Sequence, residues 1–170
     1  MKQLWQQLEK YLSTHDPELL EDLNPPATDA QIRELERTIG IQLPADFIKC
    51  LKIHDGQAGK AKWLFDGHEF LSSEKILMEW AVWVDLLVDG EFDDRAANVD
   101  EEITTKWWCK GWVPFSSNGV GDHYCLDLEP TILGNSGQVI QVIHDMPTRA
   151  LKSSDFGSWF ENFLSNKTGG

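Results

Sequence analysis

The stretch Gly111–Leu128, which reads GWVPFSSNGVGDHYCLDL, predicts two antiparallel strands joined by a tight turn. Residues 112–115 are rich in strand-forming side chains, and Asn118-Gly119 is a dipeptide that favours a hairpin turn. Residues 123–128 then alternate, as strand residues do when successive side chains point to opposite faces of a sheet. One face takes Tyr124, Leu126 and Leu128, and the other takes His123, Cys125 and Asp127.

On the C-terminal side, residues 138–143 predict another strand. A closing helix follows, begun by Ser153 or Ser154 and carrying an aromatic face. That face consists of Phe156, Trp159, Phe160 and Phe163.

The first half of the chain predicts helices. Residues 1–12 have apolar side chains at helical spacing, Thr28 and Gln31 form the pattern of a capping box, and Gly40 ends that second helix. Pro44 begins a third helix, and residues 63–71 predict a short hairpin around Asp66-Gly67. Helices followed by strands and a closing helix predict an α+β protein. We expect one domain over residues 1–170, with helices packed around a mainly antiparallel sheet.

The helix that follows Ser72 or Ser73 and runs to Val88 is apolar on nearly every side. Besides the inner face (Ile76, Leu77, Trp80, Trp83, Val84, Leu87 and Val88), it carries Met78, Val82 and Leu86 on the other side. Such a helix is either deeply buried or presents an adhesive face. An exposed face would permit a homodimer.

A run of acidic residues follows, offset by Arg95 alone. Its members are Asp85, Asp89, Glu91, Asp93, Asp94, Asp100, Glu101 and Glu102. Residues 89–105 predict a long loop, a feature that is uncommon unless it is functional or disordered. Trp107 and Trp108 come next in a β-rich segment, where neighbouring side chains face opposite sides, so one of them is a candidate exposed anchor for a partner.

Composition narrows the class of partner. The 170 residues carry a net charge of −13, which argues against binding nucleic acid or an anionic membrane surface and favours a basic protein. Three cysteines without a CxxC pair do not resemble a secreted disulfide scaffold. No signal peptide opens the chain, and no apolar run approaches the roughly 18 residues that span a bilayer. A cytoplasmic protein is expected.

The sequence offers little for catalysis. G-x-S-x-G, P-loop, H-E-x-x-H and dinucleotide motifs are absent. His123, Cys125 and Asp127 share one strand face, but residues two apart on a strand lie about 6–7 Å apart, beyond hydrogen-bond reach. Cys109, His123, Cys125 and His144 lack the spacing of a zinc site. We therefore expect no enzyme activity, metal or cofactor.

The ordered motifs resemble the SUKH superfamily, which includes the fungal Smi/Knr cell-wall regulators and many bacterial toxin-immunity proteins. The resemblance spans about residues 4–164. It is carried by LNPPAT (23–28), Ile39-Gly40, Leu43-Pro44, HDG (54–56), GWVPFS (111–116), GD-YCLD (121–127), GQVI (137–140), His144-Asp145 and the closing aromatic helix. It implies an α+β fold and protein binding, and Asp122 and Asp127 match the family motif at positions that could line a binding face.

Three functions follow from the resemblance and the residues. The leading hypothesis is an immunity-type protein that blocks a basic toxin, such as a nuclease, with residues 85–102 as electrostatic guide and Trp107 or Trp108 as anchor. The fungal members carry disordered extensions that this sequence lacks, which favours this bacterial reading. The alternative is a regulatory scaffold in cell-wall or stress signalling. A remote third is an enzyme that uses Cys125 and His123.

Overall fold

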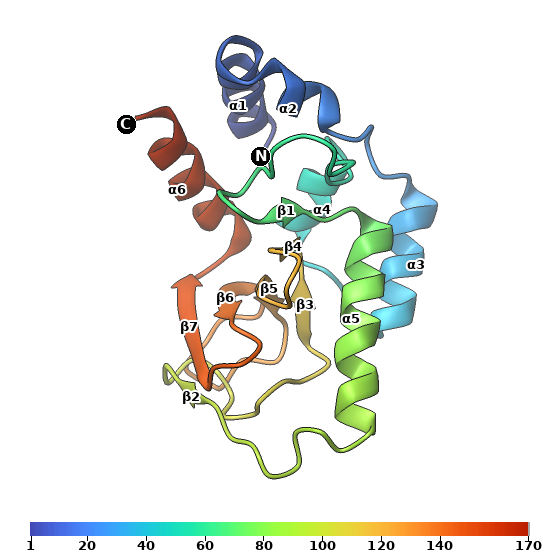
Figure 1. Cartoon of the computed structure of the whole chain (residues 1–170), viewed down its shortest axis with the longest axis vertical. Helices are drawn as coiled ribbons and strands as arrows, with labels where there is room; N and C mark the ends of the chain where they lie inside the picture. Colours follow the sequence, from blue (N-terminus) through green and yellow to red (C-terminus); the bar gives the residue numbers. More distant parts are fainter. Residues whose placement is uncertain (170) are drawn as a thin grey trace.

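A computed structural model describes residues 1–169, and in it helices surround a mainly antiparallel sheet (Figure 1). The α+β class is confirmed. In chain order the elements are α1 (Lys2–His15), α2 (Pro17–Asp22), α3 (Asp29–Ile39), α4 (Ala45–Leu51), β1 (Glu69–Phe70), α5 (Ser73–Val88), β2 (Asn98–Val99), β3 (Trp112–Pro114), β4 (Ser116–Ser117), β5 (His123–Asp127), β6 (Gln138–Val142), β7 (Thr148–Ser153) and α6 (Phe156–Thr168).

The main sheet has the strand order β2-β7-β6-β5-β3. All its pairs are antiparallel except β2 with β7, which is parallel. The predicted hairpin of residues 112–128 is confirmed, with Trp112 opposite Asp127 and Pro114 opposite Cys125. A second, two-stranded sheet joins β1 to β4, so it ties the segment before α5 to the turn between β3 and β5.

The predicted caps of α3 and α5 are confirmed. Thr28 accepts a hydrogen bond from the Gln31 N–H at 3.1 Å, while the Gln31 side chain accepts from the Thr28 N–H at 2.8 Å. Gly40 ends α3 at a φ of 80°, and Ser72 caps α5. The expected cap of α6 was wrong. Asp155 caps that helix, since its carboxylate accepts from the Ser158 N–H at 2.7 Å and Ser153 ends β7.

Two strand predictions need correction. Asp66 and Gly67 form a tight turn with φ values of 47° and 93°, but Glu69 and Phe70 pair with β4 and not with residues 63–65. Trp107 and Trp108 lie in a loop between β2 and β3. Helix α2 and strand β7 were not predicted from the sequence.

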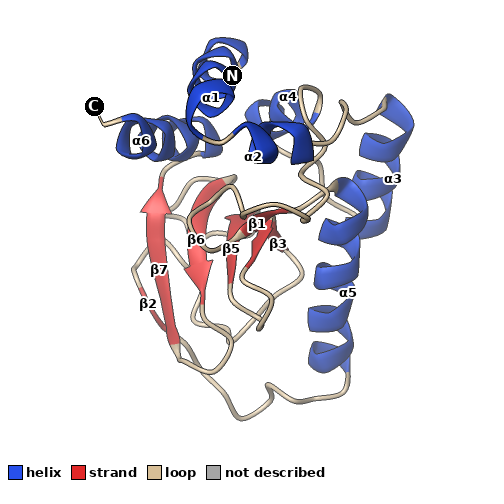
Figure 2. Ribbon diagram, turned by 45° about the horizontal axis from the view of Figure 1, so that its top comes forward, coloured by secondary structure: helices blue, strands red, loops and turns tan. Residues whose placement is uncertain are grey.

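The helices cover the sheet unequally. Figure 2 shows α1, α2, α4 and α6 gathered over one end of the sheet, while α5 runs along its side next to α3. Aromatic side chains fill the space beneath the first group, with Phe115, between β3 and β4, contacting Phe156 and Trp159 of α6 at ring-centroid distances of 5.3 and 4.9 Å. After α5, the chain passes under the sheet as residues 89–105, which form turns and one short strand, β2 (Figure 1). The predicted long loop is therefore largely confirmed.

Candidate protein-binding face

Helix α5 carries an apolar stripe that points to solvent. Its inner side is buried through Ile76, Trp80 and Trp83, and the Trp80 indole N–H donates to the Lys110 carbonyl oxygen at 2.9 Å. The stripe consists of Met78 (62% exposed), Val82 (56%) and Leu86 (38%). Because these residues are spaced four apart, they form one continuous row on the helix surface. The sequence predicted either a deeply buried helix or an exposed apolar face, and the structure supports the exposed face.

The acidic segment, residues 85–102, begins beside the end of this stripe. Its first five carboxylates belong to Asp85, Asp89, Glu91, Asp93 and Asp94, and all five residues are exposed. No ion pair within residues 1–169 involves any of them. Their combined negative field therefore acts on solvent and on anything that approaches it.

The second half of the acidic segment is anchored to the sheet. An Asp100 carboxylate oxygen accepts from the Leu151 N–H of β7 at 2.8 Å. The carbonyl oxygen of Glu102 accepts from the Thr131 N–H at 3.1 Å and from the Gln138 side chain at 3.0 Å. Asp100 thus holds this part of the loop in place through its carboxylate.

A cleft of about 310 Å³, here called the α5 cleft, lies between these two features. It is lined by Glu79, Val82, Trp83 and Leu86 of α5, by Glu91, Phe92 and Arg95 of the acidic segment, and by Gly121, His123 and His144 at the end of the sheet. The apolar stripe therefore continues into a hollow whose rim carries charged groups.

His123 lies at the inner side of the α5 cleft and is only 1% exposed. Its Nδ1 atom is 2.8 Å from the Ser116 carbonyl oxygen, which can only accept, so Nδ1 carries the proton. Burial lowers the pKa of His123 to about 4, and the ring is neutral near pH 7. Burial, and next the nearby Glu69 charge, raise the pKa of Glu79, whose Oε2 atom is 3.7 Å from His123 Nε2.

Asp122, a predicted partner-binding residue, fixes the two turns beside the cleft. Its carboxylate accepts from the His144 N–H at 3.0 Å, from His144 Nδ1 at 2.8 Å and from the Asn118 amide at 2.8 Å. Burial alone would raise the pKa of Asp122, but these hydrogen bonds outweigh it and the pKa is lowered. Asp122 is partly exposed, so it supports the rim of the cleft and remains within reach of a partner.

The expectation of an exposed tryptophan anchor was wrong, because both indoles are buried. The guanidinium groups of Arg95 and Arg149 both lie over the Trp107 ring, at 5.0 and 4.7 Å from its centroid. Trp108 is stacked on Trp83 of α5 at 5.8 Å. Both therefore attach the loop to the sheet and to α5, and neither can serve as a surface anchor.

Asp127 and Cys125 are also unsuited to the roles considered for them. Asp127 is fully buried and accepts from the Gln138 amide at 2.8 Å, so its assignment to a partner-binding face was wrong. Burial raises its pKa to about 6. Cys125 is fully buried as well, and burial raises the pKa of its thiol well above the ordinary value, which disfavours the nucleophilic thiolate.

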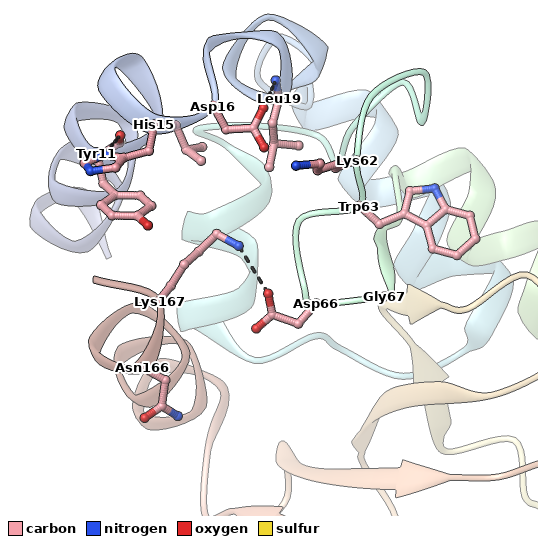
Figure 3. Close-up of a pocket in the computed structure, with 11 residues that line it drawn as sticks. Tyr11, His15, Asp16, Leu19, Lys62, Trp63, Asp66, Gly67, Asn166 and Lys167 are labelled. Carbon is pink, nitrogen blue, oxygen red and sulfur yellow. Dashed lines mark hydrogen bonds and ion pairs between the residues drawn. The ribbon is translucent and has the colours of Figure 1, made fainter. Parts of the chain in front are cut away.

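A second hollow, of about 670 Å³, lies where α1 and α2 face α6 and the Lys62–Gly67 turn (Figure 3). Lys167 crosses it toward Asp66, with Nζ and Oδ1 3.3 Å apart. Its lining mixes both charges with aromatic rings, Tyr11 being stacked on His15 at 4.2 Å. Sequence patterns gave no indication of this hollow, because its walls come from three stretches that lie far apart in the sequence.

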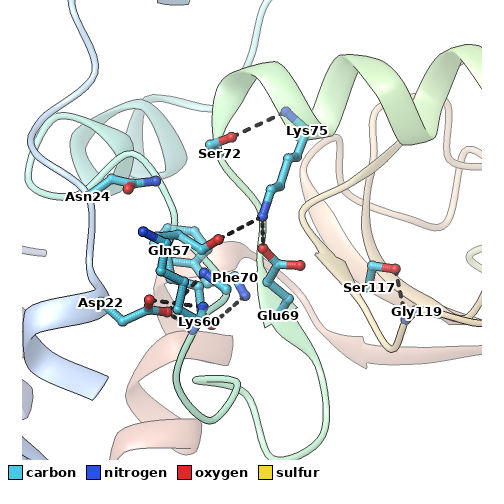
Figure 4. A network of polar contacts seen from close by, with 12 residues as sticks. Asp22, Asn24, Gln57, Lys60, Glu69, Phe70, Ser72, Lys75, Ser117 and Gly119 are labelled. Carbon is cyan, nitrogen blue, oxygen red and sulfur yellow. Dashed lines mark hydrogen bonds and ion pairs between the residues drawn. The ribbon is translucent and has the colours of Figure 1, made fainter. Parts of the chain in front are cut away.

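The segment before α5 is held by a buried polar network (Figure 4). The Gln57 side chain donates to an Asp22 carboxylate oxygen at 2.9 Å and accepts from the Leu64 and Phe70 N–H groups at 2.9 and 3.0 Å. Asp22 also accepts from the Gly59 and Lys60 N–H groups. These polar groups satisfy one another, so the network is a structural element.

Over residues 1–169, no group of three or more His, Cys, Asp or Glu side chains is arranged to hold a metal ion. The same part of the chain has no helix with both the length and the apolar character that crossing a membrane requires.

The helices flank a mainly antiparallel sheet, which makes this an α+β domain of the kind that the SUKH resemblance implied. The apolar stripe and the unpaired carboxylates lie at its edge. The chain belongs to the SMI1 / KNR4 family (SUKH-1), whose family model matches residues 26–162.

Several named fungal proteins are similar to this chain. KNR4/SMI1 homolog 2 of Debaryomyces hansenii is 24% identical over 96% of this chain and 35% of its own length. The cell wall biosynthesis/cell cycle regulator smi1 of Schizosaccharomyces pombe is 26% identical, with 85% and 32% covered. The cell wall assembly regulator SMI1 of Saccharomyces cerevisiae is 19% identical, with 98% and 40% covered. The chain thus spans about a third of the length of these relatives.

Proposed function

We propose that this chain is a non-catalytic, protein-binding domain that acts as a regulator of cell-wall formation. The names of the relatives support the regulatory role, since two of them are cell-wall regulators. They favour the scaffold alternative of the sequence analysis over its leading immunity hypothesis. The burial of Cys125 and Asp127 supports a binding role over catalysis.

The observation that carries the binding proposal is the apolar stripe of Met78, Val82 and Leu86 beside five unpaired carboxylates. Exposed apolar side chains on one continuous row cost free energy in water and gain it when a partner covers them. The carboxylates guide a basic partner and set its association rate, while the apolar contacts set its residence time. A basic protein surface is therefore the proposed partner, reached in a cytosol that keeps the three buried cysteines as thiols.

A second candidate function is immunity to a toxin, and the net charge of −13 favours it. A basic nuclease toxin would meet the acidic segment and lose access to its substrate by stoichiometric blocking. The two functions differ in the number of partners, because a regulator contacts several proteins and an antidote holds one.

The test is a pull-down with the tagged chain from an extract of its source cells, washed at low and at high salt. We expect several cell-wall or signalling proteins, identified by mass, that are reduced at high salt. A single basic, toxin-like protein in a one-to-one complex would instead establish immunity. If the chain retained no other protein and was recovered only as a homodimer, the regulatory and the immunity function would both be contradicted.

The role of the acidic segment is tested by neutralising it. The variant combines Asp89→Asn, Glu91→Gln, Asp93→Asn and Asp94→Asn. The matched control neutralises four exposed carboxylates elsewhere, namely Glu18, Glu21, Asp145 and Glu161. We expect the first variant to slow association with the captured partner about tenfold at low salt, and the control to do so much less. Equal slowing of association by the two variants would contradict the role of the acidic segment as an electrostatic guide.

A further inference from the structure

The α5 cleft contains a buried hydrogen-bond acceptor that has no donor. His123 Nδ1 donates to Ser116, so the Nε2 atom of the neutral ring offers a lone pair. Among residues 1–169 no group makes a hydrogen bond to Nε2. Buried polar atoms in folded proteins nearly always have a partner, so an unpaired acceptor at a cleft is a position where a ligand can supply the donor.

The groups around Nε2 select a positively charged donor. Glu79 Oε2 is 3.7 Å from Nε2, which is too far for a hydrogen bond between them. A nitrogen with two N–H groups, placed about 2.9 Å from each atom, would donate to both. Glu91 adds a second carboxylate to the lining. The donor that fits two carboxylates and an imidazole lone pair is an ammonium or a guanidinium group.

The remaining walls of the cleft suit the stem of a long basic side chain. Val82, Leu86 and the rings of Trp83 and Phe92, which are tilted to each other with centroids 5.8 Å apart, supply apolar surface. Lysine and arginine bury their methylene groups against such surface while the charged end finds polar partners.

The two basic residues that also line the α5 cleft are already engaged. Arg95 lies over the Trp107 ring. His144 is hydrogen-bonded to Asp122, whose carboxylate adds negative charge beside the cleft. The local balance therefore still favours a cation.

We propose that the α5 cleft binds a lysine or arginine side chain of a protein partner, with its terminal nitrogen between His123 Nε2 and Glu79 and its stem on Val82 and Leu86. The proposal rests on the binding function proposed above and names the residue type that the partner presents. It requires side chains that line the cleft to move, because the Nε2 atom is covered from solvent in the unbound chain.

The experiment uses blocked six-residue peptides that alternate leucine with arginine, with lysine, or with citrulline, the neutral counterpart of arginine. The chain is labelled with ¹⁵N for the imidazole nitrogens and ¹³C for the Val82 and Leu86 methyl groups. We expect the arginine or the lysine peptide to shift His123 Nε2 and both methyl groups, and the citrulline peptide to bind at least tenfold more weakly. Equal binding of all three peptides, or an unmoved His123 signal, would overturn the proposal.

Two variants locate the contact. Glu79→Gln removes the charge at a partly exposed position and is expected to weaken the arginine peptide about tenfold, whereas Glu161→Gln, on exposed α6 surface, leaves its affinity unchanged. His123→Phe removes the acceptor and keeps an aromatic ring in the site. If that variant does not fold, Glu79→Gln tests the proposal alone. An unchanged affinity of Glu79→Gln for the arginine peptide would refute the α5 cleft as a site for a basic side chain.

Glu79→Gln, compared with a variant that disrupts the apolar stripe, also separates this inference from the proposed function. A cellular partner that is lost when the apolar stripe is disrupted, but held normally by Glu79→Gln, would leave the binding face intact and refute the cleft as a basic-residue site.

Discussion

In the network around Gln57, polar groups are buried and paired with one another, whereas at the C-terminal end of α5 apolar side chains are exposed and carboxylates stand unpaired. The first arrangement lowers the free energy of the folded chain by itself. The second does so only when something else covers it. Comparing the two regions shows which residues maintain the fold and which are available for binding, and the predictions below test that division.

The largest effect on stability is expected for Gln57→Leu. This change leaves the Leu64 and Phe70 N–H groups without acceptors and removes a donor from Asp22, at a fully buried position. We expect a loss of about 4 kcal/mol in the free energy of unfolding, because each orphaned buried group costs about 1–3 kcal/mol. Urea unfolding followed by tryptophan fluorescence measures it, with the exposed Gln42→Leu as control. A loss under about 1 kcal/mol would contradict the structural role of the network.

The next effect compares two glycines that both have positive φ angles. A Cβ at Gly56 (φ 68°) would lie 2.3 Å from the Ser72 backbone nitrogen, whereas one at Gly40 (φ 80°) meets nothing within 4 Å. Gly40→Ala is therefore expected to cost about 1 kcal/mol through conformational strain alone, and Gly56→Ala about 3 kcal/mol. Thermal unfolding of both variants compares them. Equal losses would mean that the backbone at Ser72 moves away freely.

Both ends of α3 were predictable from sequence because their signals are local. The Thr28 hydroxyl and the Gln31 amide are three residues apart, and any chain with that spacing can close the same hydrogen bonds. Strand β7 was missed because its sequence, TRALKS, does not alternate clearly. Its place depends on Arg149, which donates to the carbonyl oxygen of Trp107, 42 residues away.

The candidate site was only partly predictable for the same reason. The helical period placed Met78, Val82 and Leu86 on one row, and the acidic run was visible by composition. Nothing in the Trp107-Trp108 dipeptide could indicate that two arginines and Trp83 would cover both rings. Glu79, Arg95 and His144 were missed as cleft residues, although the match of His144-Asp145 to the family pattern was a signal for one of them.

The buried carboxyl of Asp127 should give the fold a pH dependence of known sign. Its pKa is raised to about 6, so the folded chain holds this proton more tightly than the unfolded chain does, and protonation stabilises the fold. Relative to Asp127→Asn, the wild type should gain about 2–3 kcal/mol between pH 7 and pH 4.

Urea unfolding across this range measures the gain, and Asp122 provides the matched comparison. Its pKa is lowered, so the wild type should lose stability relative to Asp122→Asn as the pH falls to 4 and below. If stability relative to the asparagine variant changed in the same direction for Asp127 and Asp122 as the pH falls, the environment described for one of the two carboxyl groups would be wrong.

The smallest effect on stability and the largest on binding are expected at Val82. Val82→Asp places a charge at an exposed position of the apolar stripe, so the free energy of unfolding should change by less than about 0.5 kcal/mol. The matched control is Ile132→Asp, at a residue that is 99% exposed and lies far along the chain from α5.

The central claim is that the α5 face binds a protein partner, and the most direct measurement is capture of that partner by three tagged chains: wild type, Val82→Asp and Ile132→Asp. The account predicts that the wild type and Ile132→Asp retain the same proteins and that Val82→Asp, folded as judged by its unfolding curve, loses them. Retention of those proteins by Val82→Asp would place the binding surface elsewhere and contradict the account.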